Sequence, residues 1–147
     1  ALQESAAAMS LRDIYFAVSE MAVGDVEARN LDELKLQVKM DDCPVRLLLP
    51  ATEGDLEFFG LGSLTRVSWR IRDLCLWQPI IAGTGIEQCA DDMLAYIELY
   101  SDAVRALRNP AAGAAITGVS YKITPILWGT TDFWAIDITL TVEEYDP

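Results

Sequence analysis

Residues 84–110 predict one long amphipathic helix, and this segment restricts the possible folds more than any other. Thr84 and Glu87 have the spacing of a capping box, in which two side chains accept hydrogen bonds from free amides at a helix start. Apolar residues then recur every three or four positions until Asn109 and Pro110 end the pattern. At about 1.5 Å per residue this helix is roughly 36 Å long. Its apolar face needs a sheet or other helices to cover it.

The remaining segments predict a shorter helix and five strands. The shorter helix begins near Ser10 and ends before Gly24, and residues 25–32 form a polar connection. Residues 51–63 contain three glycines and are predicted to be a loop. The predicted strands, recognised by alternation or by short apolar runs, are residues 34–40, 45–49, 64–77, 116–127 and 134–143. This order predicts an α+β fold, with a largely antiparallel sheet of about five strands and two helices packed on one face.

The chain of 147 residues has the length of one domain. Residues 1–9 are small or polar, so we expect a flexible N-terminal arm before a single domain at residues 10–147. No apolar run reaches the roughly 20 residues of a membrane span. The first eight residues also lack the basic start and apolar middle of a signal peptide. We therefore expect a soluble protein that is not secreted by that route.

Composition excludes several classes of function. The net charge of −12 argues against binding to a phosphate backbone, because nucleic-acid-binding proteins usually carry a basic surface. The chain has no histidine, which removes Ser-His-Asp and Cys-His nucleophile systems and the usual near-neutral base. The hydrophobic share of 52% is high for a lone small domain. That surplus either fills the core or covers contacts with partner subunits.

Sites for a metal or an anion are not supported. The acid pairs at residues 41–42 and 91–92 could hold a divalent cation only if both carboxylates of a pair reached one cleft. Side chains of adjacent residues point apart, so this arrangement is not expected. The segment 83–85 precedes a helix start but lacks the lysine of a phosphate-binding loop. The three cysteines, Cys43, Cys75 and Cys89, have no C-x-x-C spacing. Cys75 in an apolar strand and Cys89 on the apolar helix face are interpreted as small buried apolar residues. We predict no enzyme activity, no cofactor and no metal.

The arginines are the more informative group. Eight of the eleven basic residues are arginine, and Arg66, Arg70 and Arg72 lie on one side of a predicted strand. Their forked guanidinium groups suit carboxylates across a subunit boundary. The alternative is that they pair with acids of the same chain or lie on a solvated strand face. A subunit interface at these three residues is therefore a hypothesis.

A second hypothesis concerns aromatic residues near turns. Phe58 and Phe59 are adjacent in the glycine-rich loop, so both rings cannot enter the same core. Either one ring lies under its own loop, or the loop contacts a partner. Trp128 lies beside a turn, where it is either a core residue or a contact residue.

Several of these segments together resemble the tail terminator, or tail completion, proteins of long-tailed bacteriophages. The likeness extends from about residue 10 to residue 145. It rests on the order of elements and on four sequence patterns rather than on a signature motif. These patterns are Val67-Ser68-Trp69-Arg70-Ile71, Met93-Leu94-Ala95-Tyr96-Ile97, Tyr121-Lys122-Ile123-Thr124-Pro125-Ile126 and Trp134-Ala135-Ile136-Asp137-Ile138.

The resemblance implies a structural virion protein of the tail or neck, assembled in the host cytoplasm. In that family a ring, usually a hexamer, caps the tail tube, ends its polymerisation and joins it to the head. The implied partners are further copies of the chain, the tail tube protein and a head-completion or neck protein, with DNA only as passing cargo. Another neck, connector or minor tail protein is an alternative, as is a small metal-dependent enzyme or ligand-binding domain.

Overall fold

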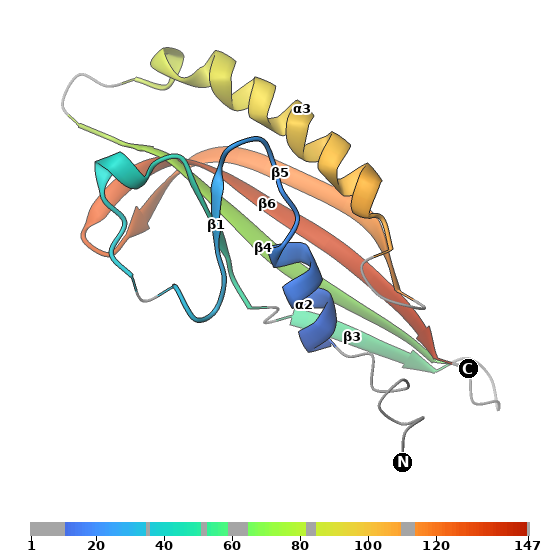
Figure 1. Ribbon diagram of the computed structural model, residues 1–147. Helices are drawn as coiled ribbons and strands as arrows, with labels where there is room; N and C mark the ends of the chain where they lie inside the picture. Colours follow the sequence, from blue (N-terminus) through green and yellow to red (C-terminus); the bar gives the residue numbers. More distant parts are fainter. Residues whose placement is uncertain are drawn as a thin grey trace.

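The computed structural model describes residues 11–34, 36–50, 53–58, 65–81, 85–109 and 114–146, whose arrangement is shown in Figure 1. Within these residues, two α-helices, α2 (Leu11–Ser19) and α3 (Ala90–Leu107), accompany one mixed sheet. Its strands are β1 (Glu27–Arg29), β2 (Val45–Leu48), β3 (Glu53–Phe58), β4 (Thr65–Pro79), β5 (Ala114–Trp128) and β6 (Thr131–Asp146). Two single 3-10 turns precede β2 and α3, namely η1 (Met40–Asp42) and η2 (Ile86–Gln88).

The sheet has six strands in the order β1-β2-β4-β6-β5, and β3 also pairs with β4. The β1–β2 pair is parallel, whereas the β2–β4, β3–β4, β4–β6 and β5–β6 pairs are antiparallel. The prediction of a largely antiparallel α+β domain is therefore confirmed. Long strands β4, β6 and β5 lie side by side and carry most of the sheet (Figure 1). They are long because alternation continues through each of them with few breaks.

Two clusters of buried side chains lie on opposite faces of this sheet. The larger cluster joins residues from one sheet face, such as Ile71 and Ile136, with residues of both helices, such as Val18 and Met93. The smaller cluster lies on the other face, because Leu74 and its neighbours alternate with members of the first cluster along β4. Val38 packs against this second cluster from the chain before β2. Both faces therefore contribute to the core at the β2 end of the sheet.

The long helix is present but begins later than the capping signal predicted. Helix α3 starts at Ala90, after the turn η2, and no side chain caps it at Cys89. Thr84 lies outside the described residues. With 18 residues the helix is about 27 Å long instead of roughly 36 Å. Its buried positions recur at the predicted helical spacing, at Met93, Tyr96, Tyr100 and Val104.

The prediction of a strand at residues 34–40 is wrong. Apart from residue 35, which is not described, this segment forms a turn and then enters η1. The Asp42 carboxylate accepts a hydrogen bond from the Lys39 backbone amide at 2.8 Å, and this local bond replaces a strand ladder. Val38 is buried while Leu36 and Met40 are exposed, so the alternation in the sequence does not correspond to one sheet face.

The loop predicted at residues 51–63 and the connection at residues 25–32 each contain a strand. Strand β3 pairs with the first part of β4, from Glu53 opposite Arg70 to Phe58 opposite Thr65. Strand β1 pairs with β2 over three positions. Both are edge strands: β1 is short and mostly polar, and β3 contains Gly54 within a glycine-rich segment, which is why their sequences resemble loops. Among the described helices, none combines the length and apolar composition needed to cross a membrane.

Candidate functional site

The three arginines proposed for a subunit interface all have acidic partners within the chain. Arg70 Nη2 lies 2.8 Å from Asp55 Oδ2, and Arg72 Nη2 lies 2.8 Å from Asp137 Oδ2. Arg66 forms a longer ion pair, 3.9 Å, with Glu143. Each pair links β4 to a neighbouring strand on the sheet face opposite the larger cluster. The alternative of intrachain pairing thus describes the isolated chain, and the interface remains a hypothesis.

These pairs form a partly exposed ladder of opposite charges. The hydrogen bond from Arg70 to Asp55 raises the pKa of that guanidinium, so Arg70 stays charged. Exposed pairs of this kind contribute little to stability because water and salt screen them. The surrounding positions on this part of the sheet face are polar as well, including Ser68, Thr139 and Thr141. The result is a polar sheet surface suited to contact with another polar surface.

The aromatic contact hypothesis is only partly covered by the described structure. The backbone of Phe58 ends strand β3, and Phe59 lies outside the described residues. Trp128 is half-buried at the end of β5, where it packs against the smaller cluster. It also lines a hollow of about 410 Å³ together with Leu34 and Val38. Trp128 therefore has a packing role within the chain, and the contact role of these three residues remains a hypothesis.

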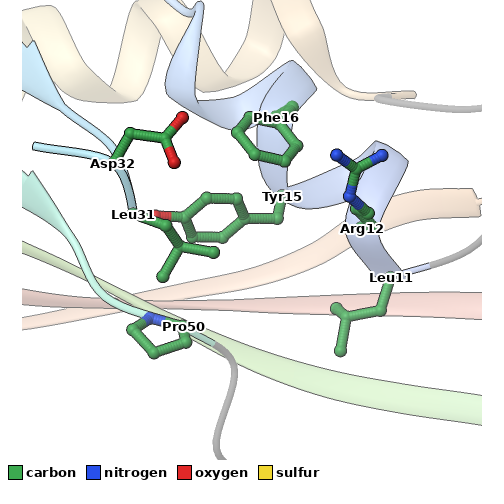
Figure 2. Close-up of a pocket in the computed structure, with 7 residues that line it drawn as sticks. All are labelled: Leu11, Arg12, Tyr15, Phe16, Leu31, Asp32 and Pro50. Carbon is green, nitrogen blue, oxygen red and sulfur yellow. The ribbon is translucent and has the colours of Figure 1, made fainter.

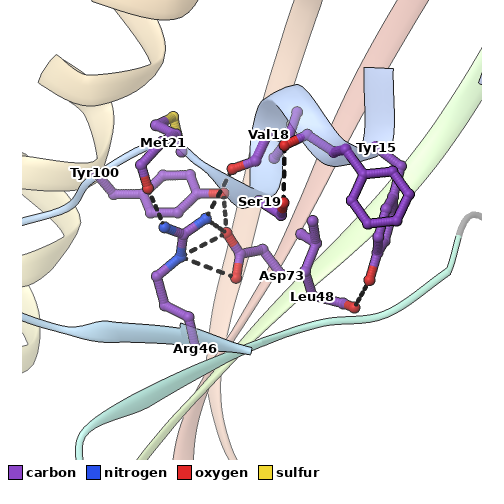
Figure 3. A network of polar contacts seen from close by, with 9 residues as sticks. Tyr15, Val18, Ser19, Met21, Arg46, Leu48, Asp73 and Tyr100 are labelled. Atoms are coloured by element: carbon purple, nitrogen blue, oxygen red, sulfur yellow. Dashed lines mark hydrogen bonds and ion pairs between the residues drawn. The ribbon is translucent and has the colours of Figure 1, made fainter. Parts of the chain in front are cut away.

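A buried ionic network connects four elements of the fold, as Figure 3 shows. Arg46 of β2 and Asp73 of β4 have no exposed surface, and their closest atoms, Nη2 and Oδ2, are 2.7 Å apart. The Tyr100 hydroxyl of α3 donates to the same Asp73 oxygen at 2.6 Å. Arg46 also donates to the carbonyl oxygens of Val18, in the last turn of α2, and of Met21, two residues beyond its end. Asp73 and these carbonyls thus satisfy the buried guanidinium.

This network anchors the C-terminal end of α2 to the sheet. The last carbonyls of a helix lack intrahelical partners and attract positive charge. Arg46 supplies that charge from the sheet, so the network fixes the end of α2 against β2 and β4. Burial, with Asp73 nearby, raises the pKa of Tyr100 well above its ordinary value, which keeps the hydroxyl protonated as a donor. A fully buried network has no access for a substrate, so its role is structural.

Arg46, Asp73 and Tyr100 were not predicted as a cluster, although the sequence contains a signal for two of them. Arg46 interrupts the apolar run of β2, and Asp73 interrupts the apolar end of β4. Two opposite charges in neighbouring buried strands indicate a buried pair. The register, in which Leu47 lies opposite Leu74, brings the two interruptions into contact. That register was not deducible from the sequence.

A surface pocket of about 440 Å³ lies beside α2, and its lining is drawn in Figure 2. Tyr15 projects into it from α2 and donates its hydroxyl hydrogen to the carbonyl oxygen of Leu48. The guanidinium of Arg12 lies 5.3 Å from the centre of the Phe16 ring. Asp32 supplies a carboxylate on the opposite side (Figure 2). Tyr15 is committed to the backbone and Arg12 to an aromatic ring, so these groups do not converge as an acid–base pair would.

Metal and nucleophile sites are not formed by the described residues. They contain no group of three or more carboxylate or cysteine side chains able to hold a metal ion. Asp41, Asp91 and Asp92 are exposed, as the interpretation of solvated acids predicted. The cysteines are unpaired thiols; burial raises the pKa of Cys43 to about 11, and Cys75 and Cys89 are buried. Such thiols are poor nucleophiles near neutral pH.

The outer edge of β5 borders an apolar groove. Val119 and Tyr121 are about half exposed and, with Ile97 and Val104 of α3, line a groove of about 320 Å³. Leu127, further along the same strand, is 64% exposed. Among the described strands, β5 pairs only with β6, so its other side has backbone groups available for pairing. Comparison of the sequence with protein-family models and with curated proteins gives no match.

Proposed function

We propose that this chain is a structural subunit without enzyme activity, which assembles with copies of itself into a ring on a bacteriophage tail tube. The ring, a hexamer as in the tail terminators that the sequence resembles, ends tube polymerisation and joins the tube to the head or neck. Its partners are the tube protein and a head-completion or neck protein, and it resides in the virion. DNA passes through the ring as cargo only.

The open edge of β5 is the observation that carries this proposal. An edge strand presents unpaired amide and carbonyl groups, and proteins that remain alone protect such edges with charges, proline or a covering segment. Strand β5 has 15 residues, yet its only charged residue is Lys122 and its only proline is Pro125. Apolar side chains at Val119, Tyr121 and Leu127 reach the surface along it. This composition favours assembly with other protein chains.

Three further features support assembly rather than catalysis. The ladder formed by Arg66, Arg70, Arg72 and their acids supplies a polar face, where exchange of partners with a neighbouring copy costs little. We infer that both helices cover the other face, since they share one buried cluster with it. The surplus of acid would also keep a channel from trapping DNA. The connector and minor tail alternatives share these features and differ only in partner.

The test measures assembly and tube binding in one preparation. We expect light scattering over a concentration series to give a mass near six subunits, and negative-stain images to show annular particles. If the free chain is monomeric, it should assemble when tail tubes are added and stop their elongation. A chain that stays monomeric and leaves tube length unchanged at every concentration contradicts the proposal. Measured affinity for a divalent cation would instead favour the metal-dependent alternative.

A further inference from the structure

Among the described strands, those at the edges of the sheet differ in charge. Strand β5 forms the edge on one side. On the other side β1, with one acidic and one basic residue, is the edge beside β2, and β3 is the edge beside the first part of β4. The sequence of β5 contains one basic residue, Lys122, and no acidic residue. The sequence of β3 contains three acidic residues and no basic residue. Each copy of the chain therefore carries one edge of each kind.

The side chains on β5 divide by face. Val119 and Tyr121 lie on the side of α3, where they line the apolar groove. Ser120 and Lys122 alternate with them, so they lie on the opposite face, and both are exposed. An approaching strand would therefore meet apolar groups on the helix side and a positive charge on the other side.

The side chains on β3 divide in the matching way. Glu53 and Asp55 are exposed, and Asp55 bonds to Arg70 on the polar sheet face. Gly54 lies between them in the strand and therefore faces the other side, where Trp69 packs against the larger cluster. A Cβ added at Gly54 would lie 2.7 Å from the indole Cδ1 of Trp69. Negative charge on β3 and positive charge on β5 thus occupy the same face of the sheet.

We propose that strand β3 of one copy pairs with the edge of strand β5 of the next copy. This pairing is the subunit contact of the proposed ring, so it rests on the proposed function. The six residues of β3 pair with part of the fifteen of β5, and Lys122 meets the acids of β3. Backbone hydrogen bonds supply the adhesion, as in other strand additions. Because the two edges differ, the contact is heterologous and propagates until a ring closes.

Charge selects this pairing over the two symmetric ones. Pairing of β5 with β5 brings two Lys122 side chains to one face without any acid on either strand. Pairing of β3 with β3 places acids against acids. Like charges directly opposite each other destabilise strand pairs, whereas opposite charges stabilise them. Of these three pairings, only the β3–β5 contact joins opposite charges and uses both the β3 edge and the β5 edge of every copy.

The first experiment asks which edges meet. Chains carrying Ser120→Cys or Glu53→Cys are prepared in a Cys43→Ser background, where the remaining thiols, Cys75 and Cys89, are buried. A short bifunctional maleimide is added to each chain alone and to their mixture. We expect a cross-linked dimer only in the mixture. A cross-link with Ser120→Cys alone identifies a symmetric β5 contact and overturns the proposal. Glu98→Cys, an exposed residue of α3, replaces Glu53→Cys in the control mixture.

The second experiment exchanges the charges. We expect Lys122→Glu and Glu53→Lys each to lower the association constant at least tenfold, and the double variant to restore it. Glu98→Lys makes the same charge change on α3 and should leave association unchanged. Rings that form with no β3–β5 cross-link overturn this contact and leave the proposed function standing. Chains that form no assembly, with or without tail tubes, overturn both.

Discussion

Asp73 is the residue whose surroundings are most demanding. Its carboxylate accepts hydrogen bonds from Arg46 and Tyr100, and all three side chains are buried. Charged groups lose several kilocalories per mole when they leave water, and only well-placed partners offset that cost. Here the partners come from the sheet and α3, with α2 carbonyls completing the shell of Arg46. Replacing any member leaves another buried group without a partner.

We expect Asp73→Asn to lower the free energy of unfolding by about 3–5 kcal/mol, because the buried Arg46 charge loses its counterion. Urea denaturation followed by circular dichroism measures the change. Asp55→Asn removes the same charge from the exposed pair with Arg70 and should cost at most about 1 kcal/mol. Equal effects at the two positions would show that the Asp73 network contributes no more than a surface pair.

The Tyr15 hydroxyl is expected to make the free energy of unfolding depend on pH in the alkaline range. Burial raises the pKa of its hydroxyl to about 12, from about 10 in an unfolded chain. Between these two values the unfolded chain releases the proton while the folded chain keeps it, so ionisation favours unfolding and stability falls as pH rises. Below pH 10 this contribution is fully present.

The matched variant is Tyr15→Phe, which loses the hydrogen bond to Leu48 but cannot ionise. We expect it to be less stable than the original chain at pH 8. The difference should shrink by roughly 1 kcal/mol per pH unit as pH rises from about 10 toward 12. Urea denaturation at a series of pH values measures it. A difference that is constant with pH would mean that the Tyr15 hydroxyl titrates alike in both states.

At the scale of elements, the β5–β6 hairpin is the unit that the sequence specifies most completely. Alternation fixes which residues face each core cluster, and Trp128 lies opposite Thr131 across a two-residue turn. Gly129 in that turn has φ of +65°, a conformation that side chains with a Cβ disfavour. No other atom lies within 4 Å of the position that a Cβ would take there. The glycine is therefore required by the backbone and not by packing.

We expect Gly129→Ala to destabilise the domain by about 1 kcal/mol and Gly129→Asn to cost less, because asparagine tolerates a positive φ better than alanine. Thermal and urea unfolding measure both. Gly118→Ala is the control, since Gly118 has no positive φ and an added Cβ would make ordinary contact with Thr141, 3.7 Å away. A cost at residue 118 as large as that at residue 129 would contradict this explanation.

The predictable elements are those with an apolar face. Strands β2, β4, β5 and β6 and both helices carry such faces, and the sequence located them to within a few residues, except that α3 begins about six residues later than predicted. Strands β1 and β3 pair through backbone bonds with few apolar side chains, so sequence patterns do not separate them from loops. The segment 34–40 has the alternation of a strand, but the bond between Asp42 and the Lys39 amide forms a turn instead. Local sequence patterns indicate which side chains are buried, but they do not indicate which strands pair.

The same limit applies to the site. Alternation placed Arg66, Arg70 and Arg72 on one side of a strand, and the structure shows them on one sheet face. Their partners were not predictable, because Asp137 and Glu143 are more than sixty residues away in the chain. The pairing of Arg46 with Asp73 depends on register between strands for the same reason. The sequence alone showed which residue types lie on the strand, whereas the contacts between distant segments became known only from the structure.

At the scale of the whole molecule, net charge opposes assembly. Each copy carries −12, so neighbouring copies repel one another over the Debye length, which falls from about 30 Å at 0.01 M salt to about 8 Å at 0.15 M. The proposed contact offers few opposite charges in return, and exposed pairs contribute at most about 1 kcal/mol each. Screening therefore removes more repulsion than attraction.

We expect the mean mass from sedimentation to rise as salt increases from about 0.01 to 0.15 M, at constant protein concentration. The control is Lys122→Glu, which removes the proposed attraction and should remain smaller than the original chain at every salt concentration. A mass that falls steadily with added salt would mean that ion pairs, rather than apolar and backbone contacts, hold the copies together.

The buried arginine also governs how the domain comes apart. Arg46 donates to carbonyls at the end of α2, and its partner Asp73 accepts from Tyr100 of α3, so a helix that leaves the sheet removes a hydrogen-bond partner from a buried charged group. Partly opened forms are therefore raised in energy relative to both the native and the fully unfolded chain. The nine residues of α2 are too few to form a stable helix alone in water. In the folded chain, α2 therefore stays formed for as long as the core does. One ion pair makes the opening of this interior a single cooperative event.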